Sequence, residues 1–158
     1  MAEKMSTSLC NLLLGGVSGS ADLKTLIDGN WKLYIFGYTG SPVSPPATAS
    51  TATTGSTLLC TVSNGGSAVT MDTAAAGGVL AKNTGETWSG TNVATGTATF
   101  YRFQDASDDN AADTGDGTRP RIQGTIGTGG TDLVVGSVSL TNGNPFAINY
   151  WTQAIVPS

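Results

Sequence analysis

Short runs of strand-forming residues, separated by glycine-rich turn signals, restrict the fold of this chain more than any other feature. The clearest run, residues 31–38, is rich in large side chains between Gly29 and Gly40 and predicts a central strand. The Asn64-Gly65 pair predicts a hairpin, because both residues tolerate positive φ. Further strand-like runs cover residues 57–63, 68–71, 78–82, 96–103, 120–126, 132–140 and 145–156. This spacing, in a chain of 158 residues, predicts a mainly β fold with a single β-sandwich or jelly-roll-like domain.

The first 29 residues follow a helical period instead. Gly15-Gly16 interrupts the pattern, Ser6, Thr7 or Ser8 and later Ser20 are placed as N-caps, and Gly29 follows the last apolar residue. We therefore predict two short helices in an N-terminal arm, residues 1–29, followed by a β domain, residues 30–158. The apolar face of the arm suits either a neighbouring subunit or the chain's own sheet. The interface candidates on this face are Leu9, Leu12, Leu13, Leu23 and Leu26.

Residues 41–56 form a different kind of segment. Three prolines are followed by alternating alanine, serine and threonine, a composition that buries too little apolar surface to fold alone. We expect an exposed loop, which acts either as a linker or as a segment lying across a partner subunit.

The charge and the residue types exclude several functions. Only 11% of the residues are charged, the net charge is -4, and no lysine or arginine cluster exists, so nucleic-acid binding is not expected. The chain has no histidine, the commonest general base and zinc ligand, so we predict neither an enzyme nor a cofactor or small-molecule site. The apolar stretch from Leu9 to Val17 is too short for a membrane span. Cys10 and Cys60 are expected to be buried apolar residues.

One acidic segment raises the question of calcium. It contains Asp105, Asp108, Asp109, Asp113 and Asp116, and calcium prefers several oxygen ligands from one flexible loop. The segment lacks the glycine and the closing glutamate of an EF-hand loop, so a solvated acidic loop is favoured over a calcium site. Arg119 and Arg121 follow it, and they are expected either to contact an acidic neighbour or to neutralise this loop within the chain.

Specific residues in five segments carry a further signal. The segments read LIDGNWKLYI at 26–35, GSTLLCTV at 55–62, TWSG at 87–90, ATGTATFYRF at 94–103 and GTIGTGGTDL at 124–133. Together they resemble a family of small structural proteins encoded among the head and tail genes of tailed bacteriophages and prophages. The segments at 105–116 and 142–150 depart from the shared pattern.

The resemblance implies a structural virion protein, assembled in the bacterial cytoplasm. The leading expectation is a capsid decoration or cement protein, a minor capsid protein that binds the major capsid protein on the head surface as a homotrimer and stabilises the shell by non-covalent contacts. The alternative is a tail, baseplate or fibre component. Such a component could bind host glycans through Trp88 and Trp151, which this alternative expects to be exposed.

Overall fold

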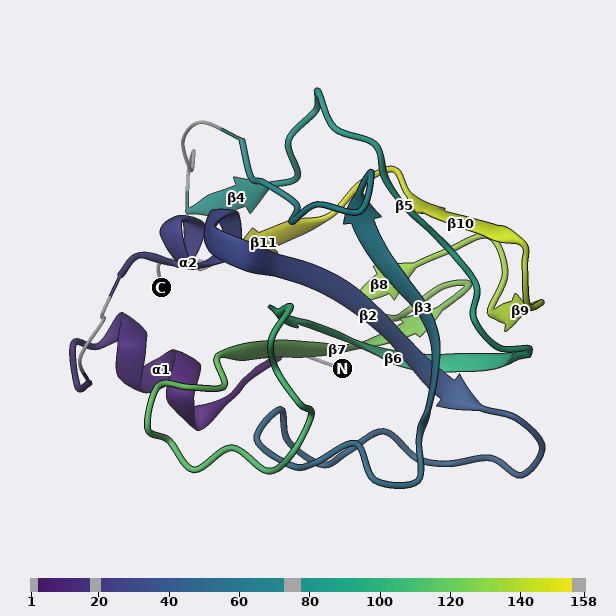
Figure 1. Cartoon of the computed structure of the whole chain (residues 1–158), viewed down its shortest axis with the longest axis horizontal. Coiled ribbons are helices and arrows are strands. Elements are labelled where there is room, and N and C mark those ends of the chain that lie inside the picture. The colour runs from purple at the N-terminus through teal and green to yellow at the C-terminus, as the bar shows by residue number, and fades with distance from the viewer. Residues whose placement is uncertain (1–2, 18–20, 73–77, 155–158) are drawn as a thin grey trace.

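The computed structural model describes residues 3–17, 21–72 and 78–154 and shows a mainly β chain (Figure 1). The helices are α1 (Thr7–Leu13) and α2 (Leu23–Asn30). The strands are β1 (Lys4–Met5), β2 (Trp31–Tyr38), β3 (Thr57–Asn64), β4 (Val79–Ala81), β5 (Trp88–Thr91), β6 (Gly96–Asp105), β7 (Arg121–Gly127), β8 (Leu133–Val134), β9 (Ser139–Leu140), β10 (Pro145–Ile148) and β11 (Thr152–Ala154). The predicted mainly β, sandwich-like fold is confirmed.

Nine strands form one sheet, in which the strand order is β1-β7-β6-β2-β3-β5-β10. The strand β8 pairs in parallel with β7, β9 pairs with β6, and β4 and β11 form a separate pair. The strand β2 lies between β6 and β3, which confirms the central strand predicted at residues 31–38.

One face of the sheet carries the apolar core. Residues on neighbouring strands stand side by side on this face, as Leu33 of β2 does with Phe103 of β6. The Phe103 ring lies 5.3 Å from Trp31, 5.8 Å from Trp88 and 5.0 Å from Trp151, measured between ring centroids. This aromatic cluster joins β2, β5, β6 and the residue before β11, so it holds distant parts of the sheet together.

The other face of β6 and β7 is also buried, but it is polar. Because side chains alternate along a strand, Arg102 and Gln104 point away from the core that contains Phe103. Their neighbours across the β6–β7 pair are Gln123 and Arg121, and all four side chains are buried. In Figure 1 the segment that follows β2 and the loop that follows β6 lie beside this part of the sheet, near α1.

Both predicted helices are present, with small differences at their ends. Ser6 caps α1 by accepting from the Leu9 amide, as expected, whereas Asp22 caps α2 by accepting from the Thr25 amide at 2.9 Å. The candidate cap Ser20 lies outside the described residues. The helix α2 is not closed by Gly29, because it continues to Asn30. Neither described helix has the length and apolar character needed to cross a membrane.

Some strand predictions were wrong in extent. Residues 68–71 form no strand and only one bridge, between Met71 and Lys82. The run at 132–140 is divided into β8 and β9, which pair with different strands, and the run at 145–156 is divided into β10 and β11 up to residue 154. The strand β5 was not predicted. Its sequence, WSGT, carries no strong strand signal, and it is held by its neighbours β3 and β10.

Gly37 allows the strands β2 and β6 to approach closely. The register between them shifts at Phe36 and Gly37, and a Cβ atom at Gly37 would lie 1.9 Å from the Thr97 carbonyl oxygen. No side chain fits at that distance, so the irregularity in the sheet requires glycine.

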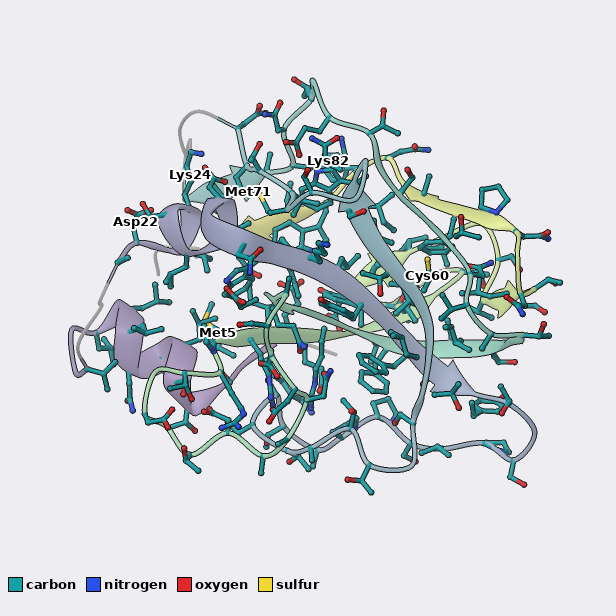
Figure 2. The ribbon with its side chains drawn as sticks, in the orientation of Figure 1. Met5, Asp22, Lys24, Cys60, Met71 and Lys82 are labelled. Atoms are coloured by element: carbon teal, nitrogen blue, oxygen red, sulfur yellow. The ribbon has the colours of Figure 1, made fainter. Side chains whose placement is uncertain are left out.

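The two cysteines are free and differ in burial. Cys60 lies buried on β3 (Figure 2), and burial raises the pKa of its thiol to about 11. Cys10 is only half-buried, so the prediction that both cysteines are buried holds for Cys60 alone.

Candidate functional site

The loop after β6 contributes a buried ion pair to the polar face of the sheet. Arg121 of β7 donates from Nε to Asp108 Oδ2 at 2.7 Å and from Nη2 to Asp108 Oδ1 at 2.6 Å. Both side chains are 0% exposed. This two-point contact fixes the acidic loop, residues 106–120, against the sheet.

A second buried guanidinium lies beside the first. Arg102 of β6 donates from Nε to Gln123 Oε1 at 3.0 Å and from Nη2 to the Thr51 carbonyl. The pKa of Arg102 is lowered to about 10, chiefly by burial and also by the nearby charge of Arg121, while Asp108 acts in the opposite direction. Asp108 therefore pairs with Arg121 and acts on Arg102 through its charge alone, while the Gln123 side chain and the Thr51 carbonyl supply acceptors for Arg102.

Those carbonyls belong to residues 46–53, which we call the strap. Gln123 Nε2 donates to the Pro46 carbonyl at 2.8 Å, and Lys4 Nζ donates to the Ala47 carbonyl at 2.7 Å. Ala49 is fully buried, and its carbonyl accepts from Arg121 Nη1 at 3.4 Å. The loop at 41–56, which was expected to be exposed, is therefore held against the sheet in its middle part. Buried side chains of the sheet bind its carbonyl groups, because buried donors need hydrogen-bond acceptors.

The strap and the acidic loop are also bonded to each other. The Thr53 amide donates to the Asn110 carbonyl at 3.3 Å, and the Asp113 amide donates to the Ser50 carbonyl at 2.8 Å. The two segments thus form one continuous layer over the polar face.

The N-terminal arm completes this layer. The strand β1 pairs with β7, so that Lys4 stands opposite Gln123. Ser6 Oγ donates to the Arg119 carbonyl at 2.9 Å and accepts from the Arg121 amide at 3.0 Å. Asp113 accepts from the Ser8 hydroxyl and, at 2.8 Å, from the Ser8 amide. These contacts join the arm to residues more than a hundred positions away.

Hydrogen bonding decides the pKa of Asp113. Burial alone would raise this pKa, but the bonds from Ser8, Gly115 and Ser50 outweigh it and leave the pKa below its ordinary value. Glu3 shows the opposite balance. Burial raises its pKa, and the nearby Asp132 adds to the rise, although the Tyr101 hydroxyl donates a hydrogen bond to its carboxylate.

The five aspartates of the calcium candidate bind different partners. Asp108 holds Arg121, Asp109 accepts from Arg119 at 2.9 and 3.1 Å, and Asp113 holds Ser8. The other two close local turns: Asp105 accepts from the Ser107 amide at 2.8 Å and Asp116 accepts from the Thr118 amide at 2.9 Å. Within the described residues no group of three metal-ligating side chains comes together. The loop is also not simply solvated, because the Asp108 side chain is buried.

The interface candidates lie within the chain's own contacts. Leu9, Leu12 and Leu23 are buried, and Leu13 and Leu26 pack half-buried against the core. Of the two alternatives for the arm, the structure shows packing on the chain's own sheet. Arg119 and Arg121 likewise pair with acids of the same chain, namely Asp109 and Asp108.

The tryptophans suggested as glycan platforms are not on the surface. Trp88 is 0% exposed and Trp151 is 2% exposed, and their ring centroids lie 6.3 Å apart in the core. The Trp88 indole donates to Glu86 Oε2 at 2.8 Å, which satisfies its polar atom inside the fold. The expectation of exposed Trp88 and Trp151 was therefore wrong.

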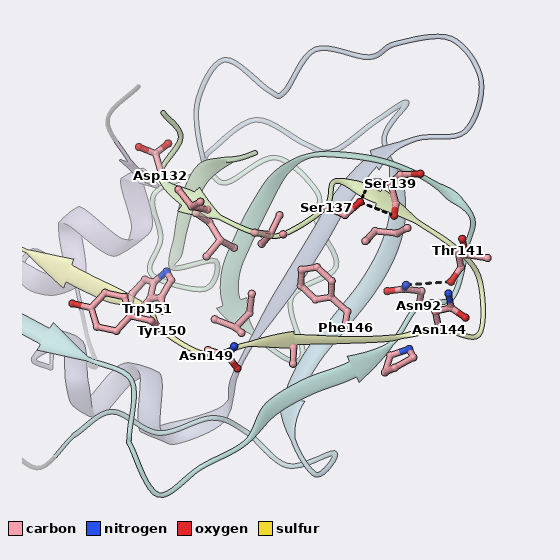
Figure 3. A pocket seen from close by; sticks show the side chains of 18 of the residues that line it. Asn92, Asp132, Ser137, Ser139, Thr141, Asn144, Phe146, Asn149, Tyr150 and Trp151 are labelled. Atoms are coloured by element: carbon pink, nitrogen blue, oxygen red, sulfur yellow. Dashed lines mark hydrogen bonds between the residues drawn. The ribbon is translucent and has the colours of Figure 1, made fainter. Parts of the chain in front are cut away.

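A cleft that the sequence did not reveal lies on another part of the molecule. It opens between residues 132–141 and residues 144–152 and has a volume of about 620 Å³ (Figure 3). Two sequence signals lie at it: the segment 142–150, which departs from the shared pattern, and Trp151, which is buried in its lining.

No family model, curated protein or solved structure matches this chain. The protein is therefore classified by its fold, as a mainly β, sandwich-like domain. Its sheet has an apolar core on one face and, on the other face, a buried layer of arginines, glutamines and aspartate under the strap, the acidic loop and the arm.

Proposed function

We propose that this chain is a structural protein of a tailed bacteriophage particle, and that it acts as a decoration protein on the head surface. Its partners would be the major capsid protein and further copies of itself, as a homotrimer. The observation that carries the proposal is the buried layer around Arg102, Asp108 and Arg121, which fixes two long surface segments, the strap and the acidic loop, to one sheet. The assignment to a phage particle is supported by the resemblance of the five sequence segments to phage structural proteins.

Such a layer suits an adhesive role. Loops that are already ordered lose less conformational entropy when they bind, so more of the contact energy contributes to affinity. Many copies bound around a shell would add their separate contacts. In this proposal the charged residues act in fixing the loops rather than in catalysis.

A tail, baseplate or fibre component is the second candidate. The observation that favours it is the cleft between residues 132–141 and 144–152, because a host-binding module needs a concave site of this kind.

Quantitative mass spectrometry of purified particles tests the two candidates. Particles from a bacterium that encodes the chain would be analysed with isotope-labelled peptides, using the major capsid protein as the internal standard. A copy number comparable with that of the capsid protein supports head decoration, whereas a few copies per particle overturn it in favour of the tail. Absence from the particles overturns the particle proposal itself. Light scattering of the purified chain tests the trimer.

A further inference from the structure

The cleft has two walls that come from separate segments of the sheet. One wall contains the edge strand β10 and the residues that follow it, and the other contains β8, β9 and the residues between them. Figure 3 shows Ser137 and Ser139 on one wall and Phe146 on the other, with the Phe146 ring turned toward the first wall. A volume of about 620 Å³ lies within the range of sites for small ligands.

The floor of the cleft is apolar and its rim is polar. Leu133, Leu140, Phe146 and Ile148 are buried residues of the lining. The exposed rim carries the hydroxyl and amide side chains of Ser137, Ser139, Thr141, Asn144 and Asn149. An apolar floor with a few polar groups above it is the usual composition of a ligand site.

Asn92 places an unpartnered oxygen in this lining. The residue is 3% exposed, and its Nδ2 donates to the Thr141 carbonyl at 3.1 Å. Its Oδ1 is buried and has no hydrogen-bond partner among the described residues. A buried acceptor without a donor is uncommon, so a ligand that supplies a hydroxyl hydrogen would complete it.

The charge of the cleft selects against anions. None of the described lining residues is a lysine or an arginine, and the single carboxylate, Asp132, accepts two bonds from Thr125, both at 2.8 Å. At one end stands Tyr150, which is 74% exposed (Figure 3). The hydroxyl and amide groups of Ser137, Ser139, Thr141 and Asn92 lie toward the other end of the cleft (Figure 3). An exposed ring at one end and hydroxyl and amide groups at the other suit an extended uncharged ligand that has apolar faces and several hydroxyls.

An added peptide strand fits this cleft less well. Strand addition requires a row of free backbone groups along an edge. The strand β10 is four residues long and begins with Pro145, which has no amide hydrogen, while β8 and β9 have two residues each.

We propose that this cleft binds a neutral oligosaccharide that spans it, with Tyr150 stacking on the face of a sugar ring at one end and Asn92 Oδ1 accepting a bond from a sugar hydroxyl at the other. The inference depends on the cleft alone. It therefore holds or fails separately from the assignment to a phage particle.

A glycan array with neutral and anionic oligosaccharides, followed by calorimetric titration of the best neutral binder, tests the proposal. Tyr150→Ala is expected to weaken binding about tenfold, because it removes the stacking contact, and Tyr150→Phe is expected to keep most of it. Leu14→Ala is the control, since Leu14 is also a large, highly exposed residue, at 84%, and lies outside the cleft lining. Asn92→Ala should also weaken binding, provided that its thermal unfolding matches that of the unchanged chain.

Three results would overturn the proposal. The first is that the chain binds no neutral oligosaccharide at millimolar concentration, and the second is that it prefers anionic glycans. The third is that Tyr150→Ala binds with the same affinity as the unchanged chain. Capture of an extended peptide at this cleft without glycan binding would replace the proposal with strand addition. If Asn92→Ala does not fold, the comparison of Tyr150→Ala with Tyr150→Phe decides the question alone.

Discussion

The ion pair between Asp108 and Arg121 provides the sharpest test of the structure. In the unchanged chain Asp108 Oδ1 also accepts from the Asn110 amide at 2.7 Å. Asp108→Asn removes the negative charge but keeps the size of the side chain and one oxygen for this bond. It leaves the Arg121 guanidinium buried beside Arg102, which is also positively charged. Removing one partner of a fully buried pair costs about 3–5 kcal/mol, a large part of the roughly 5–15 kcal/mol that holds a typical domain folded.

The neighbouring pair supplies the control. Asp109 accepts two hydrogen bonds from Arg119, in the same kind of two-point contact, but its side chain is 59% exposed. Water and salt screen a contact at the surface, so Asp109→Asn should leave the stability almost unchanged. The two variants differ by one position in the sequence and by burial in the structure.

Urea unfolding at pH 7 and calorimetry would measure both variants. For a domain of this size the loss in Asp108→Asn corresponds to a fall in Tm of roughly 6–20 °C. Adding Arg121→Met to Asp108→Asn should recover part of the loss, because the uncompensated charge is then removed. Equal stability of Asp108→Asn and Asp109→Asn would refute the reasoning. So would a double variant, Asp108→Asn with Arg121→Met, whose loss of stability equals the sum of the losses of the two single variants.

Three further predictions concern pH and packing. Because the pKa of Glu3 is raised in the folded chain, the stability that its protonated form contributes is lost as the pH rises above the ordinary value of 4.5. The Tm of Glu3→Gln, minus the Tm of the unchanged chain, should therefore increase between pH 4 and pH 8. Because the pKa of Asp113 is lowered in the folded chain, its ionised form stabilises the fold above the ordinary value of 3.8, and this stabilisation is lost as the pH falls below that value. Asp113→Asn should therefore have a lower Tm than the unchanged chain at neutral pH, and the difference should become smaller as the pH falls. Gly37→Ala should destabilise the chain by about 1–3 kcal/mol in urea unfolding through its clash with Thr97, whereas Gly129→Ala, which meets open space, should change little.

The parts of the fold that could be predicted are those with a strong local pattern. The strand at 31–38 was found because large side chains dominate it and Gly29 and Gly40 bound it. The run at 132–140 has a similar apolar content, but Leu133 pairs with β7 and Leu140 pairs with β6. Such a division depends on partners elsewhere in the chain, and no local pattern contains it.

The sites were harder to predict than the strands. The sequence put Asp108 and Arg121 among the notable residues but left open whether their partners lay inside or outside the chain. It could not tell buried tryptophans from exposed ones, because an indole ring is found in both settings. The cleft could not be predicted because its lining comes mainly from two segments, residues 132–141 and 144–152, and no local pattern shows that these segments face each other.

The contacts of the arm also bear on how the chain becomes folded during synthesis. Ser6 bonds to residues 119 and 121, and Ser8 bonds to residue 113. The arm therefore leaves the ribosome before these partners, which lie more than a hundred residues further along the chain, and must wait for them. Contacts of such long sequence separation slow folding, and the waiting segment is open to wrong partners during that time. Refolding of the chain should accordingly be slow, with protection of the Ser6 and Ser8 amides from hydrogen exchange among its last events.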